Sequence, residues 1–120
     1  SEGCRQASGK LEEGGQGLGP SPYDLLASSL ATCTAMTLRM YIDRKKWKVE
    51  EILVHVEHNK EHSDDSSPES EGGMIDILER KIEVFGTIDD DQKRRLLEIA
   101  NKCPVHKTLL SEMTIRSKIF

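Results

Sequence analysis

Residues 21–44 read SPYDLLASSLATCTAMTLRMYIDR, and no other stretch of the 120-residue chain is as apolar. Ser21 followed by Pro22 is typical of a helix start, because a serine oxygen can accept a backbone amide hydrogen bond and proline has no amide hydrogen to leave unpaired. Asp24 adds a carboxylate to the first turn, where the helix dipole favours negative charge. We therefore predict a helix from Ser21 to Arg44.

The centre of this helix, residues 25–38, carries no charged side chain. At ~1.5 Å per residue it is about 21 Å long, which is too short to span a bilayer. A helix that is apolar all round must then be buried all round. We predict a central core helix, and because only 4% of the residues are aromatic, the rest of the chain has little bulk with which to cover it. This imbalance predicts a homodimer.

Charge and cysteine spacing exclude several classes of protein. The net charge is −4 and the two signs are interspersed, so the chain has no basic surface that would bind nucleic acid or an anionic membrane. Cys4, Cys33 and Cys103 form neither a zinc pattern nor an even disulfide framework. We see no signal-peptide pattern. We expect a cytoplasmic protein without a metal or a cofactor.

The segments on either side of the helix differ in character. Residues 1–19 are polar and rich in glycine, and we expect a flexible or truncated N-terminal segment there, with one folded domain over residues 20–120. After the helix, apolar residues alternate with polar ones at Ile52, Val54 and Val56, which predicts a half-buried strand. Residues 59–73 contain serine, aspartate and glycine and are expected to form a loop.

The last third of the chain predicts a strand, two helical elements and a further strand. The strand runs from about Met74 to Phe85, with a change of parity near Leu78. Asp89 and Gln92 are spaced as a capping box that opens a helix ending near Lys102. A short helical turn over residues 104–110 precedes a final strand in which Met113, Ile115 and Ile119 alternate with polar residues. The fold class is α+β with a largely antiparallel sheet.

Two cysteines could carry chemistry. Cys33 lies in the middle of the predicted helix, so it is either a small core residue or a reactive thiol that needs a cation from elsewhere in the fold. Cys103 precedes Pro104, which makes it a predicted N-cap whose sulfur faces backbone amides; its alternative role is to fill a helix junction. Two such thiols permit a reaction in which one attacks a peroxide and the other captures the resulting sulfenic acid.

Other polar residues give weaker signals. His106 lies one turn beyond Cys103 and either tunes that thiol or faces solvent. Arg80 shares the parity of the apolar residues of its strand, so it either points inward toward a carboxylate or thiolate or reaches the sheet margin. His58 and His62 have a metal-ligand spacing, but they fall at the end of a strand and in a loop, which favours surface histidines.

Three motifs resemble the osmotically inducible protein C and organic hydroperoxide resistance (OsmC/Ohr) superfamily. They are GPSPYDLLA at residues 19–27, CTAMTL at residues 33–38 and CPVHKTL at residues 103–109. They occur in the order expected for that superfamily, with a predicted strand pair between the second and the third. The resemblance runs from about Gly19 to the C-terminus.

The resemblance implies an intertwined α+β homodimer in which long central helices pack on antiparallel sheets. It implies that Cys33 is the peroxidatic residue, which reduces an organic hydroperoxide, and that Cys103 is the resolving residue. A dithiol reductant of the lipoyl type would then recycle the disulfide. For direct resolution, the two Cα atoms must come within about 7 Å of each other.

The sequence departs from the pattern of the peroxidase members at two places. Those members have a glutamate directly after the proline that opens the helix, where this chain has Tyr23 followed by Asp24. They also bring an arginine from an N-terminal strand, and Arg5 does not match it. Either that hairpin is shortened or missing, or the partner subunit supplies the residues. The alternative function is therefore a non-catalytic module of the same fold that binds an apolar ligand or a partner.

Overall fold

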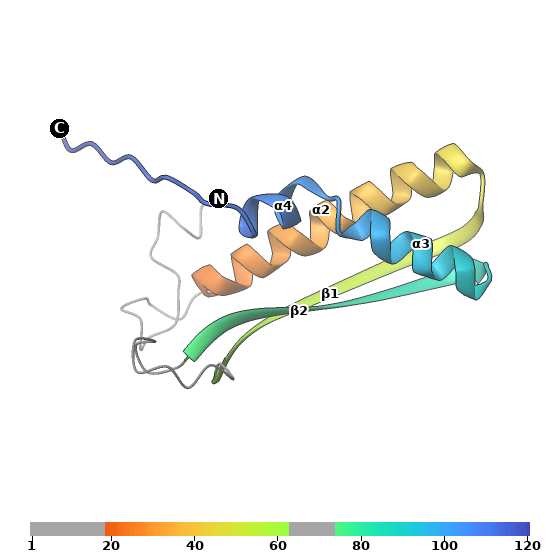
Figure 1. Ribbon diagram of the computed structural model, residues 1–120, viewed down its shortest axis with the longest axis horizontal. Coiled ribbons are helices and arrows are strands. Elements are labelled where there is room, and N and C mark those ends of the chain that lie inside the picture. Colours follow the sequence, from red (N-terminus) through yellow and green to blue (C-terminus); the bar gives the residue numbers. More distant parts are fainter. Residues whose placement is uncertain (1–18, 63–73) are drawn as a thin grey trace. The chain divides into compact units, whose positions relative to one another are not determined.

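The computed structural model describes residues 19–62 and 74–120. Its elements are, in order, helix α2 (Pro22–Lys45), strands β1 (Lys48–His62) and β2 (Met74–Thr87), and helices α3 (Asp90–Ala100) and α4 (Pro104–Leu109) (Figure 1). This order confirms the α+β class. The predicted N-terminal segment 1–19 lies outside the described residues except for Gly19.

The described residues form two compact units. The first contains residues 19–31, 54–62 and 74–82, and the second contains residues 32–53 and 83–120. Helix α2 and both strands run through the two units. The candidate cysteines Cys33 and Cys103 both belong to the second unit.

Helix α2 begins where the sequence predicts. The amide of Asp24 donates a hydrogen bond to the Ser21 hydroxyl, and the amide of Ser21 donates one to the Asp24 carboxylate, both at 3.1 Å. This reciprocal pair satisfies two backbone groups that a helix start leaves without partners. Asp24 is therefore a capping residue.

The C-terminal end of α2 is closed by a turn around Lys46, which has a left-handed φ of 59°. The Lys46 amide donates to the carbonyl of Asp43, and the Trp47 amide donates to the carbonyl of Ile42. This pair of hydrogen bonds is the Schellman arrangement, in which the left-handed residue is usually glycine.

One stripe of α2 is buried, and the opposite side is exposed. In the second unit Thr34, Leu38 and Ile42 are fully buried, whereas Met36 and Met40 are 61% and 72% exposed. Helices α3 and α4 lie beside this part of α2 (Figure 1). The described residues thus leave one side of this part of α2 uncovered, in keeping with the expectation that the rest of the chain has too little bulk to cover it.

By length and composition alone, α2 is also long and apolar enough to cross a membrane. One such helix is weak evidence, because core helices of soluble proteins have the same length and composition. The stripe of α2 that packs against α3 and α4 is what a core helix requires.

Strands β1 and β2 form a two-stranded antiparallel sheet, since β1 meets β2 at His58 with Asp76 and at Lys48 with Gly86. A Cβ at Gly86 would lie 2.2 Å from the Lys48 carbonyl oxygen, so only glycine permits this close approach. The predicted parity change is confirmed, because Ile77 and Leu78 are both half-buried.

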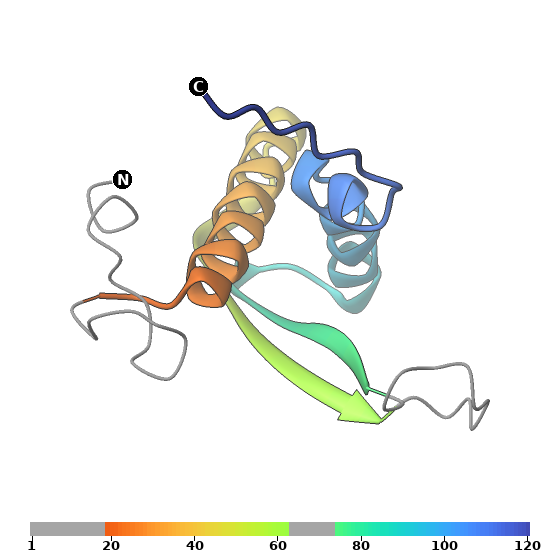
Figure 2. The same cartoon turned by 90° about the vertical axis from the view of Figure 1, so that its left-hand side faces the viewer.

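Two sequence expectations about strands are corrected. Strand β1 continues to His62 and therefore includes the first residues of the predicted loop; the rest of that loop, 63–73, lies outside the described residues. The predicted final strand is wrong: residues 111–120 are exposed and have no regular secondary structure (Figure 2). A strand needs a partner for its backbone hydrogen bonds, and β1 and β2 are the strands among the described residues.

The Lys46 turn gives a test with opposite outcomes at adjacent positions. Lys46→Gly should stabilise the chain by about 0.5–1 kcal/mol, because glycine adopts the left-handed conformation without the penalty of a Cβ. Lys45→Gly, one residue earlier and helical, should destabilise it by about 1 kcal/mol. Urea unfolding of both variants measures the difference. Destabilisation by both substitutions to the same extent would contradict the assigned turn.

Candidate functional site

Cys103 lies at the junction between α3 and α4 and is fully buried. Its extended backbone makes it the N-cap of α4, and its sulfur accepts a hydrogen bond from the His106 amide at 3.3 Å. The predicted N-cap role is thus confirmed. The Cys103 amide in turn donates to the carbonyl of Ala100, which ties the residue to the end of α3.

The sulfur of Cys103 also meets α2. The Thr34 Oγ1 atom lies 3.7 Å from the Cys103 Sγ atom, and both side chains are fully buried. Thr34 directly follows Cys33, so the two cysteines lie near each other although seventy positions separate them. Cys33 is half-buried and carries a free thiol, as does Cys103.

Tyr23, the residue after the helix-opening proline, belongs to a small cluster in the first unit. Its ring stacks on the His58 ring with the centroids 4.2 Å apart and the planes 5° from parallel. His58 Nε2 lies 3.0 Å from a carboxylate oxygen of Asp76, and the Lys60 ammonium lies 3.9 Å from the same oxygen. His58 is thus held on two sides. It is a structural residue that joins the start of α2 to both strands.

The remaining predicted site residues lie at different places. His106 is half-buried on α4 and contributes its backbone amide to the Cys103 sulfur. Arg80 is half-buried on β2 and belongs to the first unit. Its pairing with a thiolate stays a prediction. Among the described residues, no three His, Cys, Asp or Glu side chains are grouped so that they could hold a metal ion.

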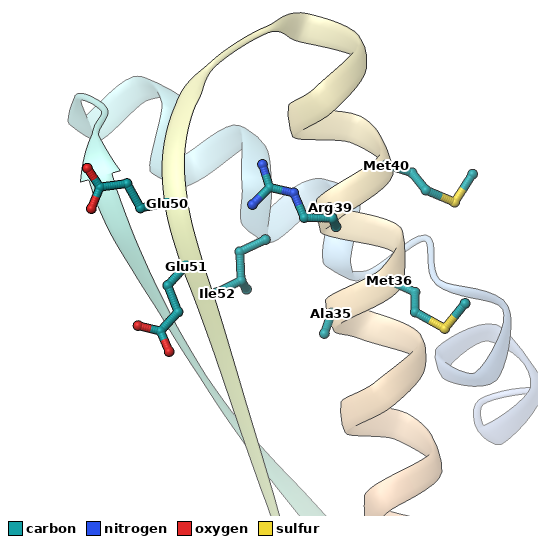
Figure 3. A pocket seen from close by; sticks show the side chains of 7 residues that line it. All are labelled: Ala35, Met36, Arg39, Met40, Glu50, Glu51 and Ile52. Atoms are coloured by element: carbon teal, nitrogen blue, oxygen red, sulfur yellow. The ribbon is translucent and has the colours of Figure 1, made fainter.

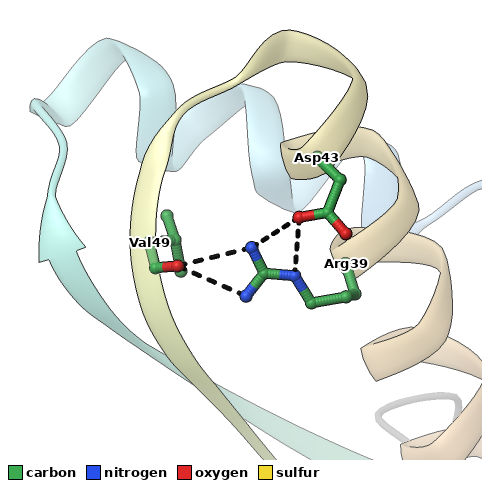
Figure 4. Close-up of polar contacts among 3 residues, drawn as sticks. All are labelled: Arg39, Asp43 and Val49. Carbon is green, nitrogen blue, oxygen red and sulfur yellow. Dashed lines mark hydrogen bonds and ion pairs between the residues drawn. The ribbon is translucent and has the colours of Figure 1, made fainter.

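Sequence reasoning missed Arg39. It lies on α2, and its guanidinium donates hydrogen bonds to a carboxylate oxygen of Asp43 at 2.7 and 3.0 Å and to the Val49 carbonyl at 3.3 Å (Figure 4). It therefore joins the end of α2 to the start of β1. The spacing of Arg39 and Asp43 predicts an ion pair within a helix, but only the structure shows the contact with the strand.

A pocket of about 520 Å³ lies beside this arginine. Figure 3 shows Arg39, Ala35 and Ile52 directed into the space between α2 and β1, with Glu50 and Glu51 pointing outward from the strand. The pocket lining also includes Met36 and Met40. Its charged lining residues are Arg39, Glu50 and Glu51. The first unit contains a smaller pocket of about 250 Å³ beside Asp24 and His55.

Arg95 on α3 provides a second connection to α2. Its Nε atom donates to the Tyr41 hydroxyl at 3.2 Å, and its guanidinium pairs with Glu98 at 2.7 Å. The hydrogen bond to Tyr41, followed by that to Glu98, raises the pKa of Arg95 above its ordinary value. On β1, a hydrogen bond from His55 lowers the pKa of the exposed Glu57 carboxyl.

Solved structures show the same fold. The chain is similar to the organic hydroperoxide resistance protein OsmC of Legionella pneumophila, with a TM-score of 0.64, 20% identity and coverage of 84% of this chain and 69% of that one. It is also similar to an OsmC-like protein of Mycoplasma pneumoniae, with a TM-score of 0.59, 21% identity and coverage of 76% and 62%. No curated protein matches the chain.

A third similar structure is a Vibrio cholerae protein named for organic hydroperoxide resistance, with captopril bound in one of its active sites. The TM-score is 0.57 at 23% identity, and the match covers 82% of this chain and 64% of that one. The chain thus spans about two thirds of the length of these structures. The model of the family described as OsmC-like protein matches residues 14–118. The chain belongs to the OsmC-like protein family.

Proposed function

We propose that this protein is a thiol-dependent peroxidase that reduces organic hydroperoxides through Cys33 and Cys103 in the reducing cytoplasm. One observation carries the proposal: the buried Cys103 sulfur contacts the residue that follows Cys33 on α2. Family membership and the names of the similar structures support a hydroperoxide as substrate. The two free thiols supply the electrons that the reaction needs.

The reaction proceeds in three balanced steps. The Cys33 thiolate attacks the distal peroxide oxygen, the O–O bond breaks, and with one proton the products are a sulfenic acid and an alcohol. The Cys103 thiolate then attacks the sulfenic sulfur, and with another proton a disulfide forms and water leaves. A dithiol reductant of the lipoyl class reduces the disulfide and is itself oxidised to a cyclic disulfide.

Burial gives the two thiols different environments. Cys33 is half-buried, so a substrate can reach it, whereas Cys103 is fully buried. The Cys33 thiol must meet a peroxide from solution, whereas the Cys103 thiol needs to meet only the oxidised Cys33. This asymmetry supports Cys33 as the attacking residue.

The activity test is consumption of cumene hydroperoxide in the presence of a dithiol. Cys33→Ser should abolish consumption, because it removes the sulfur that takes up the oxygen. Cys103→Ser should turn over more slowly than the wild type, because its sulfenic acid must be captured by the added dithiol and not by a neighbouring thiol of the chain. Cys4→Ser is the matched control and should leave the rate unchanged. Equal rates for wild type and Cys33→Ser would refute the proposal.

The pocket beside Arg39 favours a second candidate function, a non-catalytic module that binds an apolar ligand. Its lining of Ala35, Met36, Met40 and Ile52 suits an alkyl chain. The hydroperoxide assay separates the two functions. A binding module would show no turnover with any variant.

We further propose that the active protein is a homodimer. The described sheet has two strands, which is marginal for an independent sheet. Apolar side chains are also left exposed on two segments of the second unit, namely Met36 and Met40 on α2 and Met113, Ile115 and Ile119 near the C-terminus. A second copy of the chain would cover these residues.

Size-exclusion chromatography with light scattering tests this assembly. The wild type should have twice the mass of one chain at micromolar concentration. Ile115→Asp should shift it toward the monomer, because the charge falls on the apolar parity of the segment, whereas Thr114→Asp adds the same charge on the polar parity and should leave the dimer intact. A stable wild-type monomer would contradict the proposal.

A further inference from the structure

Thr34 is a polar residue at a fully buried position of α2. The other fully buried residues of this stripe, Leu38 and Ile42, are apolar. Burying a hydroxyl is unfavourable unless it is hydrogen-bonded. The Thr34 hydroxyl lies 3.7 Å from the Cys103 sulfur, within hydrogen-bonding range for sulfur. A valine has nearly the same shape but no hydroxyl, so it would lack the contact that Thr34 makes with the sulfur.

The Cys103 sulfur has contacts on two sides. The His106 amide donates to it at 3.3 Å from α4, and the Thr34 hydroxyl meets it from α2. The amide can only donate, so the sulfur is the acceptor of this hydrogen bond. The hydroxyl can donate or accept, because its hydrogen rotates about the C–O bond.

We propose that Thr34 is a positioning residue for Cys103, whose hydroxyl holds the resolving sulfur against α2 and donates a hydrogen bond to its thiolate. The inference rests on the proposed function, since only the resolving step requires a Cys103 thiolate. It gives two consecutive residues of α2 different roles. Cys33 takes up the oxygen, and Thr34 prepares the thiol that removes it.

The physical basis is the difference between two hydrogen bonds. When Cys103 is protonated, its thiol is a weak donor to the Thr34 oxygen. When Cys103 is ionised, the hydroxyl rotates and donates to a full negative charge, and such charge-assisted bonds are roughly twice as strong as neutral ones. Removing the hydroxyl therefore costs the thiolate more than it costs the thiol.

Because Cys103 is fully buried, its thiolate needs the hydrogen bond from the Thr34 hydroxyl. A thiolate without water or hydrogen-bond donors is strongly disfavoured in an apolar environment. Once Cys33 is a sulfenic acid, the Cys103 thiolate must displace its oxygen, and with one proton the products are the disulfide and water. The rate of this step follows the thiolate fraction of Cys103. Thr34 acts on that fraction without touching the peroxide.

The test measures the thiolate itself and needs no peroxide. In a chain carrying Cys4→Ser and Cys33→Ser, Cys103 is the one remaining thiol, and its ionisation is followed by the ultraviolet absorbance of the thiolate against pH. The titration of a chain that also carries Cys103→Ser is subtracted. Thr34→Val should raise the midpoint by about one pH unit, a decrease of about tenfold in thiolate at neutral pH.

Matched variants separate a hydrogen bond from a packing effect. Thr34→Ser keeps the hydroxyl and should retain the original midpoint, whereas Thr34→Ala lacks it and should behave as Thr34→Val does. Thr32→Val makes the same change at an exposed position of α2 and should have no effect. An unchanged midpoint in both Thr34→Val and Thr34→Ala, or an equal shift in Thr34→Ser, would overturn the inference. An absence of peroxidase activity in the wild type would refute the proposed function. The titration would still show whether Thr34 stabilises the Cys103 thiolate.

Discussion

In the second unit, two polar contacts join α2 to the segment from α3 to α4, in addition to the buried apolar residues of α2 and α3. Arg95 donates to the Tyr41 hydroxyl, and the Cys103 sulfur meets the Thr34 hydroxyl. On α2 these points lie seven residues, or about two helical turns, apart on one stripe. Two contacts along one stripe fix both the distance and the direction of α3 against α2. The sulfur of Cys103 therefore has a set position relative to the α2 backbone, which a single contact would not provide.

The parts of the fold that were predictable are those encoded within a few residues. The start of α2 follows from Ser21 and Asp24, and the start of α3 follows from the capping box of Asp89 and Gln92. Cys103 before Pro104 gives the N-cap of α4. Each of these signals links residues three positions apart or adjacent, so the local backbone alone decides the outcome.

The parts that were not predictable depend on contacts between distant segments. Helical periodicity shows that residues 33 and 34 point about 100° apart, but it does not show which of them faces α4. Arg39 is one polar residue on a long helix until β1 places the Val49 carbonyl beside it. The C-terminal alternation predicts a strand that the structure does not show, because a strand also requires a neighbour, and that requirement is absent from the local sequence.

The location of Thr34 beside Cys33 explains how one helix could serve both thiols of the proposed reaction. Successive helical residues point in directions about 100° apart, so the same turn can present one side chain to a partly open surface and the next to the interior. Cys33 is half-buried and Thr34 is fully buried, in keeping with this geometry. In the proposed reaction the Cys33 thiol must be accessible because it meets the substrate, whereas burial protects the Cys103 thiol from overoxidation. Burial alone would leave the Cys103 thiol protonated. In the dry interior, hydrogen bonds from the start of α4 and from α2 oppose that effect.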